Sequence, residues 1–137
     1  MGLKKKSNME NHKIINAFYM DTQGKLQSPN RRFDFVDDFY NGYAKVRLNN
    51  KYNLIDTQGK LVSPNLWFDG VDYFSNGYAR VKLNNKWNLI DTQGNLISPS
   101  QWFDDVYNFS NRYAKVKLNN KWNFIDTQGN IIYYRSH

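Results

Sequence analysis

The sequence predicts an all-β array of stacked repeats, and three observations carry this prediction. First, the 137-residue chain repeats with a fixed period of 35 residues, marked by Asp-Thr-Gln-Gly at Asp21, Asp56, Asp91 and Asp126. Second, apolar and charged residues alternate within each copy, as they do in half-buried strands. Third, Asn, Asp and Gly residues stand between these stretches, where turns are expected. A period of this size is typical of solenoids, propellers and related stacks.

We expect about three and a half units, each a three-stranded β-meander, in this array. The chain holds four Asp-Thr-Gln-Gly segments but only three of the segments that connect them, so it begins and ends in the same phase of the repeat. An open or superhelical stack is favoured, because the outer copies are atypical in the way that end caps are. A closed toroid, such as a small propeller or trefoil-like barrel, is the alternative, since terminal strands in the same phase could complete one another.

The first strand of the unit is predicted at residues 43–48, where Ala, Val and Leu alternate with Lys and Arg. Asn49 and Asn50 then signal a turn, because Asn tolerates positive φ. We expect a three-residue loop that also includes Lys51, because a two-residue loop would set apolar residues opposite polar ones. In this register, the aromatic residue that follows the loop points into the core together with Val and Leu.

A second turn is predicted at residues 57–59. Asp56 binds this turn through its side chain, and Gly59 supplies a residue in the left-handed conformation. The turn joins strands predicted at residues 52–56 and 60–63. Both strands carry apolar residues on their two faces, so we expect the meander to be covered on both sides by its neighbours.

Composition excludes several classes of function. Apolar residues make up 40% of the chain and aromatic residues 17%, which is typical of a folded protein. Cysteine is absent and the two histidines, His12 and His137, lie in terminal segments, so no thiol chemistry and no cofactor or metal site is predicted. Neither a Gly-rich phosphate loop nor a Ser/His/Asp arrangement is present, and we expect no enzymatic activity.

The net charge of +7 is unevenly distributed. Residues 1–13 predict a basic, flexible tail that holds four lysines and one glutamate, and residues 14–137 predict a single domain. No apolar segment long enough for a secretory signal or a membrane span occurs. A cytoplasmic protein without membrane contact is therefore expected.

At the motif level, the chain resembles the WG-repeat family, also called the KWG-repeat family. The matching stretches are residues 85–94, Pro99, Phe103-Asp104 and residues 109–116, and the resemblance extends over about residues 16–137. It implies an all-β, largely bacterial family without catalytic residues. Asn53, Asn88 and Asn123 replace the usual Gly after the aromatic residue. Since Asn is frequent at unusual φ and ψ, we expect the backbone reason for that Gly to persist.

Matching positions of successive repeats form a candidate binding surface. Lys and Arg recur at two sites of the first strand, and Trp recurs beside the turn that precedes it. The predicted stripe comprises Lys45, Arg47, Arg80, Lys82, Lys115, Lys117, Trp67 and Trp102. With the adjoining Lys51, Lys86 and Lys121, it would form a ladder of nine cations. The competing interpretation is a solvated strand face whose cations discourage edge pairing and are neutralised by nearby Asp residues.

The other recurring residues are interpreted as structural. Asp before x-x-Gly is a turn former, and its presence in every copy argues against a single active site. Trp87 and Trp122 are expected in the core, whereas Trp67 and Trp102 are equally compatible with core and surface.

The leading functional hypothesis is a non-catalytic scaffold for protein–protein interaction, such as an accessory or regulatory subunit. A module that binds nucleic acid or another polyanion through the Lys/Arg ladder is the alternative. A carbohydrate-binding module that uses exposed aromatic rings is the third. Another protein is thus the expected partner, with nucleic acid as the second choice.

Overall fold

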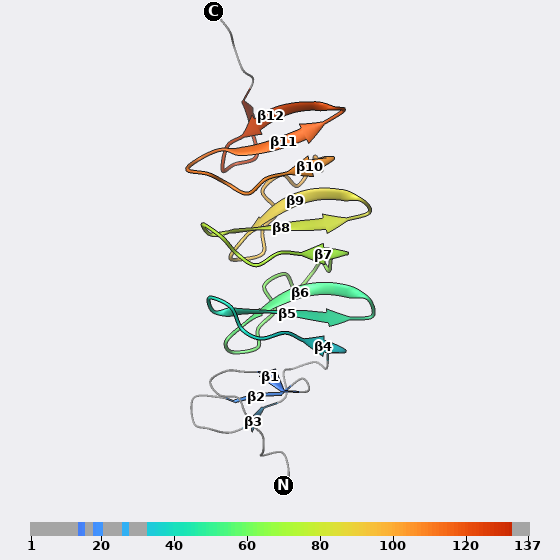
Figure 1. Cartoon of the computed structure of the whole chain (residues 1–137), viewed down its shortest axis with the longest axis vertical. Coiled ribbons are helices and arrows are strands. Elements are labelled where there is room, and N and C mark those ends of the chain that lie inside the picture. Colours follow the sequence, from blue (N-terminus) through green and yellow to red (C-terminus); the bar gives the residue numbers. More distant parts are fainter. Residues whose placement is uncertain (1–13, 16–17, 21–25, 28–32, 133–137) are drawn as a thin grey trace, which may run out of the picture. The chain divides into compact units, whose positions relative to one another are not determined.

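The chain folds into small antiparallel sheets that recur about every 35 residues (Figure 1). This computed structural model describes residues 14–15, 18–20, 26–27 and 33–132, with side chains from residue 33 onward. Four sheets are present in these residues, and none of them is closed on itself. The chain divides into two compact units, Met1–Trp67 and Phe68–His137. The predicted tail, residues 1–13, lies outside the described residues, and its boundary stays a prediction.

The first unit contains two three-stranded sheets. Their strands are β1 (Ile14–Ile15), β2 (Phe18–Met20) and β3 (Leu26–Gln27), then β4 (Phe35–Val36), β5 (Tyr43–Leu48) and β6 (Lys51–Asp56). Apolar residues at alternate positions of β5 give this strand one face that points into the core. Ala44 and Val46 on that face are fully buried. They pack with Phe33, Ile55 and Leu61 in one core cluster.

The second unit contains a three-stranded and a four-stranded sheet. Their strands are β7 (Gly70–Val71), β8 (Tyr78–Leu83) and β9 (Lys86–Asp91), then β10 (Asp105–Val106), β11 (Ala114–Leu118), β12 (Lys121–Ile125) and β13 (Ile131–Ile132). The two repeats join edge to edge, because the N–H of Trp87 donates to the carbonyl of Phe103 (2.8 Å) and the N–H of Phe103 donates back (2.9 Å). Leu89 and Ile90 are both 1% exposed, which confirms that this strand is covered on both faces.

The turn between the two long strands differs from the predicted one. Leu48 pairs directly with Lys51, so the loop holds two residues and not three. Asn49 and Asn50 both have positive φ, at 52° and 65°. A pair of residues in this conformation forms the tight hairpin turn whose twist matches that of the strands. The predicted position of the turn is therefore confirmed, but the predicted loop length is wrong.

The reason for this error is a buried asparagine. In the two-residue register, Val46 pairs with Asn53, and both are buried. The amide of Asn53 donates to the carbonyl of Ser63 (2.7 Å), while its oxygen accepts from the N–H of Ser63 (3.2 Å) and of Leu54 (2.8 Å). A polar side chain can occupy the core when its hydrogen bonds are made. The alternation of polar and apolar residues therefore predicts the wrong face for Asn53.

Asn88 repeats these contacts with Ser98 in the second unit. Neither Asn53 nor Asn88 has positive φ. The expected backbone reason for replacing Gly at this position is therefore wrong at these two sites. Side-chain hydrogen bonding to the following segment takes its place.

The second predicted turn is confirmed, but its outer strand is short. The Asp56 carboxylate accepts from the N–H groups of Gln58 and Lys60, both at 2.9 Å, and Gly59 has a φ of 82°. Ile55 and Leu61 face each other as expected, but only as an isolated bridge. The third strand of this sheet is instead β4, which pairs with β5 before the hairpin. The meander thus begins one segment earlier than predicted.

Candidate binding surface

The β8–β9 hairpin holds a Trp ring against two cations. Lys82 lies directly opposite Trp87, and Arg80 follows on the same face of β8. The guanidinium carbon of Arg80 lies 4.2 Å from the centre of the Trp87 ring, and the Lys82 ammonium nitrogen lies 5.5 Å from it. Both distances allow cation–π attraction. Trp87 is half-buried and packs against the core cluster of this unit, so its predicted core position is confirmed in part. It shares its strand face with Lys82 and not with Val81, which contradicts the predicted register.

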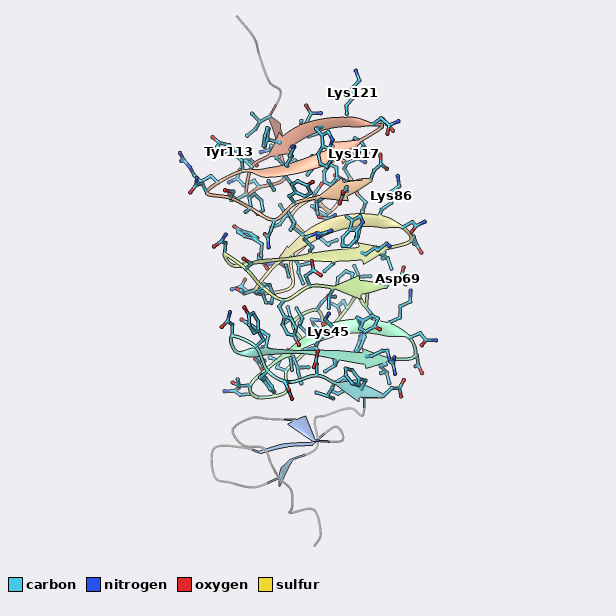
Figure 2. The ribbon with its side chains drawn as sticks, in the orientation of Figure 1. Lys45, Asp69, Lys86, Tyr113, Lys117 and Lys121 are labelled. Carbon is cyan, nitrogen blue, oxygen red and sulfur yellow. The ribbon has the colours of Figure 1, made fainter. Side chains whose placement is uncertain are left out.

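The β11–β12 hairpin repeats this arrangement in a more open form. Lys117 lies opposite Trp122, and the ammonium groups of Lys115 and Lys117 lie 5.0 and 5.7 Å from its ring centre. Tyr107 adds a second ring, 5.4 Å from Trp122 between centres. Trp122 is 40% exposed, so its predicted core position is wrong. The two rings are exposed, and Lys115 and Lys117 lie half-buried beside them; Figure 2 labels Lys117.

In the first unit, the same positions carry other rings. Arg47 lies opposite Tyr52 on one side and Phe35 on the other. Its guanidinium carbon lies 5.9 Å from the centre of the Phe35 ring, which is 47% exposed. Lys45 follows on the same face of β5, at the site that Figure 2 labels. The predicted cation positions of this unit therefore also share their strand face with aromatic residues.

The two remaining predicted residues lie apart from these contacts. Trp67 is half-buried and packs against the core of the first unit, with its ring centre 6.2 Å from that of Phe33. Trp102 is half-buried in the second unit. In the described part of the chain, neither ring takes part in a cation–aromatic contact with the predicted Lys and Arg residues.

Two cations of the second unit, Arg80 and Lys86, are paired with carboxylates of its two repeats. Arg80 lies 3.5 Å from Asp72 and 3.7 Å from Asp105, and Lys86 lies 2.5 Å from Asp104. The hydrogen bond from Lys86, followed by that from the N–H of Asn119, lowers the pKa of Asp104 below its ordinary value. Residues 33–132 as a whole contain 11 Lys and Arg against 10 Asp, so the charge of this region is nearly balanced.

The recurring Asp residues form turn contacts, as their pattern indicates. The carboxylates of Asp34, Asp69 and Asp104 accept hydrogen bonds from the first Asn of the two-residue turn in the same repeat, at 2.8–2.9 Å. Asp126 likewise binds its own turn, and the N–H of Asn130 lowers the pKa of Asp126. Among the described residues, no group of three His, Cys, Asp or Glu side chains could hold a metal ion.

We name the residues Arg80, Lys82, Trp87, Tyr107, Lys115, Lys117 and Trp122 the cation–aromatic face of the second unit. Its four cations were predicted from the sequence, but its two Trp residues were assigned to the core. The Asn-Asn pair was the available signal, because a two-residue turn alone sets Trp87 opposite Lys82. Such a set of rings and cations binds other molecules by stacking and charge rather than by covalent chemistry.

Comparison with known proteins agrees with the repeat geometry. No helix in the described stretches has the length and apolar character that crossing a membrane requires. No curated protein and no solved structure matches the chain. A family model described as "WG containing repeat" matches residues 18–52, 54–87 and 89–122, which together make up most of the chain. Three successive matches in step with the three hairpins place this protein in the WG-containing repeat family.

Proposed function

We propose that this protein is a non-catalytic module that binds another protein through the cation–aromatic face, as an accessory or regulatory subunit would. The observation that carries the proposal is the pair of exposed rings, Tyr107 and Trp122, beside Lys115 and Lys117. Trp and Tyr are among the side chains that most often dominate the energy of protein interfaces, and the two Lys residues add charge beside them.

Charge balance favours a protein partner over a polyanion. Arg80 is engaged by two carboxylates, and Lys86 by one. Polyanion binding depends on cations that are free to replace the counterions of successive phosphates. A protein surface instead gains from rings and scattered charges of both signs. Binding to nucleic acid is therefore treated as the alternative result of the experiment below.

The test is affinity purification from the cells that make the protein, with and without nuclease, at low and moderate salt. The altered bait carries Lys82→Glu and Lys117→Glu, which reverse two cations beside the Trp rings. The control bait carries Lys60→Glu and Arg112→Glu, two exposed cations at turns outside this face. Arg80 is left unchanged, because its ion pairs with Asp72 and Asp105 join two repeats. Reversing its charge would change stability as well as binding.

We expect the altered bait to lose its partner by about tenfold or more, and the control bait to keep it. The capture should survive nuclease and moderate salt. Equal capture by both baits would remove the cation–aromatic face from the proposed function. Loss of all capture after nuclease treatment would replace the protein partner by nucleic acid.

A further inference from the structure

A second two-residue turn lies directly before each of the long hairpins. In the first unit this turn is Asn41-Gly42, which precedes β5. The N–H of Tyr40 donates to the carbonyl of Tyr43 (2.7 Å), and the N–H of Tyr43 donates back (3.1 Å). Asn41 and Gly42 both have positive φ, at 52° and 91°. This is the tight turn for which Asn-Gly is a preferred sequence.

The corresponding turns of the second unit are Asn76-Gly77 and Asn111-Arg112. Asn76 and Gly77 also have positive φ, at 57° and 84°, and Asn111 has a φ of 61°. All of these turn residues are exposed. An Asn side chain therefore stands at the same position of the turn in three repeats, followed by Gly in two of them and by Arg in the third.

An Asn side chain that is followed by Gly can react with its own backbone. The backbone nitrogen of the Gly loses its proton to water and attacks the side-chain carbonyl carbon of the Asn. The bond from that carbon to the amide nitrogen breaks, ammonia leaves, and a cyclic succinimide remains. Water then opens the ring to aspartate or isoaspartate. The net change replaces the amide NH2 by OH, without oxidation or reduction.

The surroundings of Gly42 leave this reaction open. Gly has no side chain to hinder the approach of its nitrogen, and both turn residues are exposed to the water that the second step consumes. A Cβ placed on Gly42 would meet nothing within 4 Å, so the space beside it is free. The reaction also needs a backbone rotation at Asn41. The paired Tyr40 and Tyr43 slow this rotation and do not prevent it, because turns open locally at a low cost in free energy.

The side chain of Asn76 is held in a way that opposes the reaction. Its amide nitrogen, which would have to leave, donates to the carbonyl of Phe109 at 3.2 Å. Within the described part of the first unit, no carbonyl accepts a hydrogen bond from the amide of Asn41 in this manner. One hydrogen bond of this kind changes an equilibrium by about fivefold. The two Asn-Gly turns therefore differ in how firmly the reacting side chain is fixed.

We propose that Asn41 is a site of spontaneous deamidation, and that its counterpart Asn76 is protected by the hydrogen bond to Phe109. The isoaspartate product adds a carbon to the main chain of a turn whose two residues match the twist of the strands, so it weakens the hairpin. The site lies in the first unit, outside the cation–aromatic face, and is independent of the proposed function.

The test follows deamidation of the purified full chain in mildly alkaline buffer, which favours the deprotonated Gly nitrogen. Trypsin cleaves after Lys and Arg, so the three turns fall in separate peptides, residues 33–45, 61–80 and 87–112. Mass spectrometry over time gives the fraction deamidated at each Asn. We expect Asn41 to react about fivefold faster than Asn76, and Asn111 to react most slowly. No reaction at Asn41, or equal rates at Asn41 and Asn76, would overturn the proposal.

The same chain unfolded in guanidinium chloride separates the effect of sequence from that of structure. Asn41 and Asn76 should then react at similar rates, because each is followed by Gly and Tyr and the bond to Phe109 is lost. A rate difference that persists in the unfolded chain would exclude the protection proposed for Asn76.

Two variants locate the reaction. Asn41→Asp should abolish the mass change in the peptide of residues 33–45, which contains no other Asn, and leave the other two peptides as they are. Arg112→Gly gives the third turn the same dipeptide, and Gly is compatible with the backbone conformation there. It should raise the rate at Asn111 severalfold. An unchanged rate at Asn111 would contradict the role assigned to the residue after the Asn.

Discussion

The buried amide of Asn88 offers the sharpest test of the hairpin register. The side chain is 1% exposed and makes three hydrogen bonds: it donates to the carbonyl of Ser98 at 2.8 Å, and its oxygen accepts from the N–H of Ser98 at 3.2 Å and of Leu89 at 2.9 Å. Asn88→Ala removes all three and leaves buried backbone groups without partners. At about 1 kcal/mol for each bond, the free energy of unfolding should fall by about 3 kcal/mol. That is a large part of the stability of a small protein.

The assay is equilibrium unfolding in denaturant, followed by Trp fluorescence. Asn123→Ala is the matched control, because Asn123 has the same place in the next repeat but is only half-buried, so water can replace part of what its amide provides. We expect a clearly smaller loss for Asn123→Ala. In the three-residue register, Asn88 would face solvent and Asn88→Ala would change stability by less than about 0.5 kcal/mol. That result would refute the register described here.

Three other changes test separate features. Asp104→Asn should lower the melting temperature at neutral pH, because the pKa of Asp104 is lowered in the folded state and its carboxylate therefore adds stability above the ordinary pKa of 3.8. This stability is lost as the pH falls through the folded-state pKa, so the difference from wild type should disappear at low pH. Thermal melts at a series of pH values measure the difference, and a constant difference would contradict the prediction. Gly129 has a φ of 81°, and a Cβ added there would overlap the carbonyl oxygen of Ile97, whereas a Cβ added at Gly77 meets nothing within 4 Å. Gly129→Ala should therefore lower the free energy of unfolding by more than the roughly 1 kcal/mol of strain expected for Gly77→Ala. Equal losses for the two variants in denaturant unfolding would disprove the close approach. Trp122→Ala should cost about 1 kcal/mol and no more than about 2, well below the 3–5 kcal/mol of a core Trp, and a core-sized loss in denaturant would return this ring to the core.

Much of the architecture could be predicted from the sequence, because repetition makes each local signal appear several times. The period, the all-β class, the long first strand and the Asp-x-x-Gly turn follow from residue patterns whose physical basis is local. The turn at residues 57–59 needs only Asp56 and Gly59, which lie beside it, and the structure confirms both roles. The cations of the candidate surface could be predicted for the same reason, since alternation along one strand fixes the face they share.

The hairpin register and the aromatic half of the surface were decided by the tertiary structure. Whether Asn53 faces the core depends on Ser63, ten residues away, whose backbone satisfies its amide. Sequence parity treats Asn as polar and therefore exposed, and that choice moves the ring after Lys51 to the wrong face. Contacts between segments also decide how far a side chain is exposed. Leu89 is covered because residues of the next repeat pack on it, while Phe124 at the equivalent position is 45% exposed. Local chemistry thus determined the elements, and contacts between segments determined which side chains are available for binding.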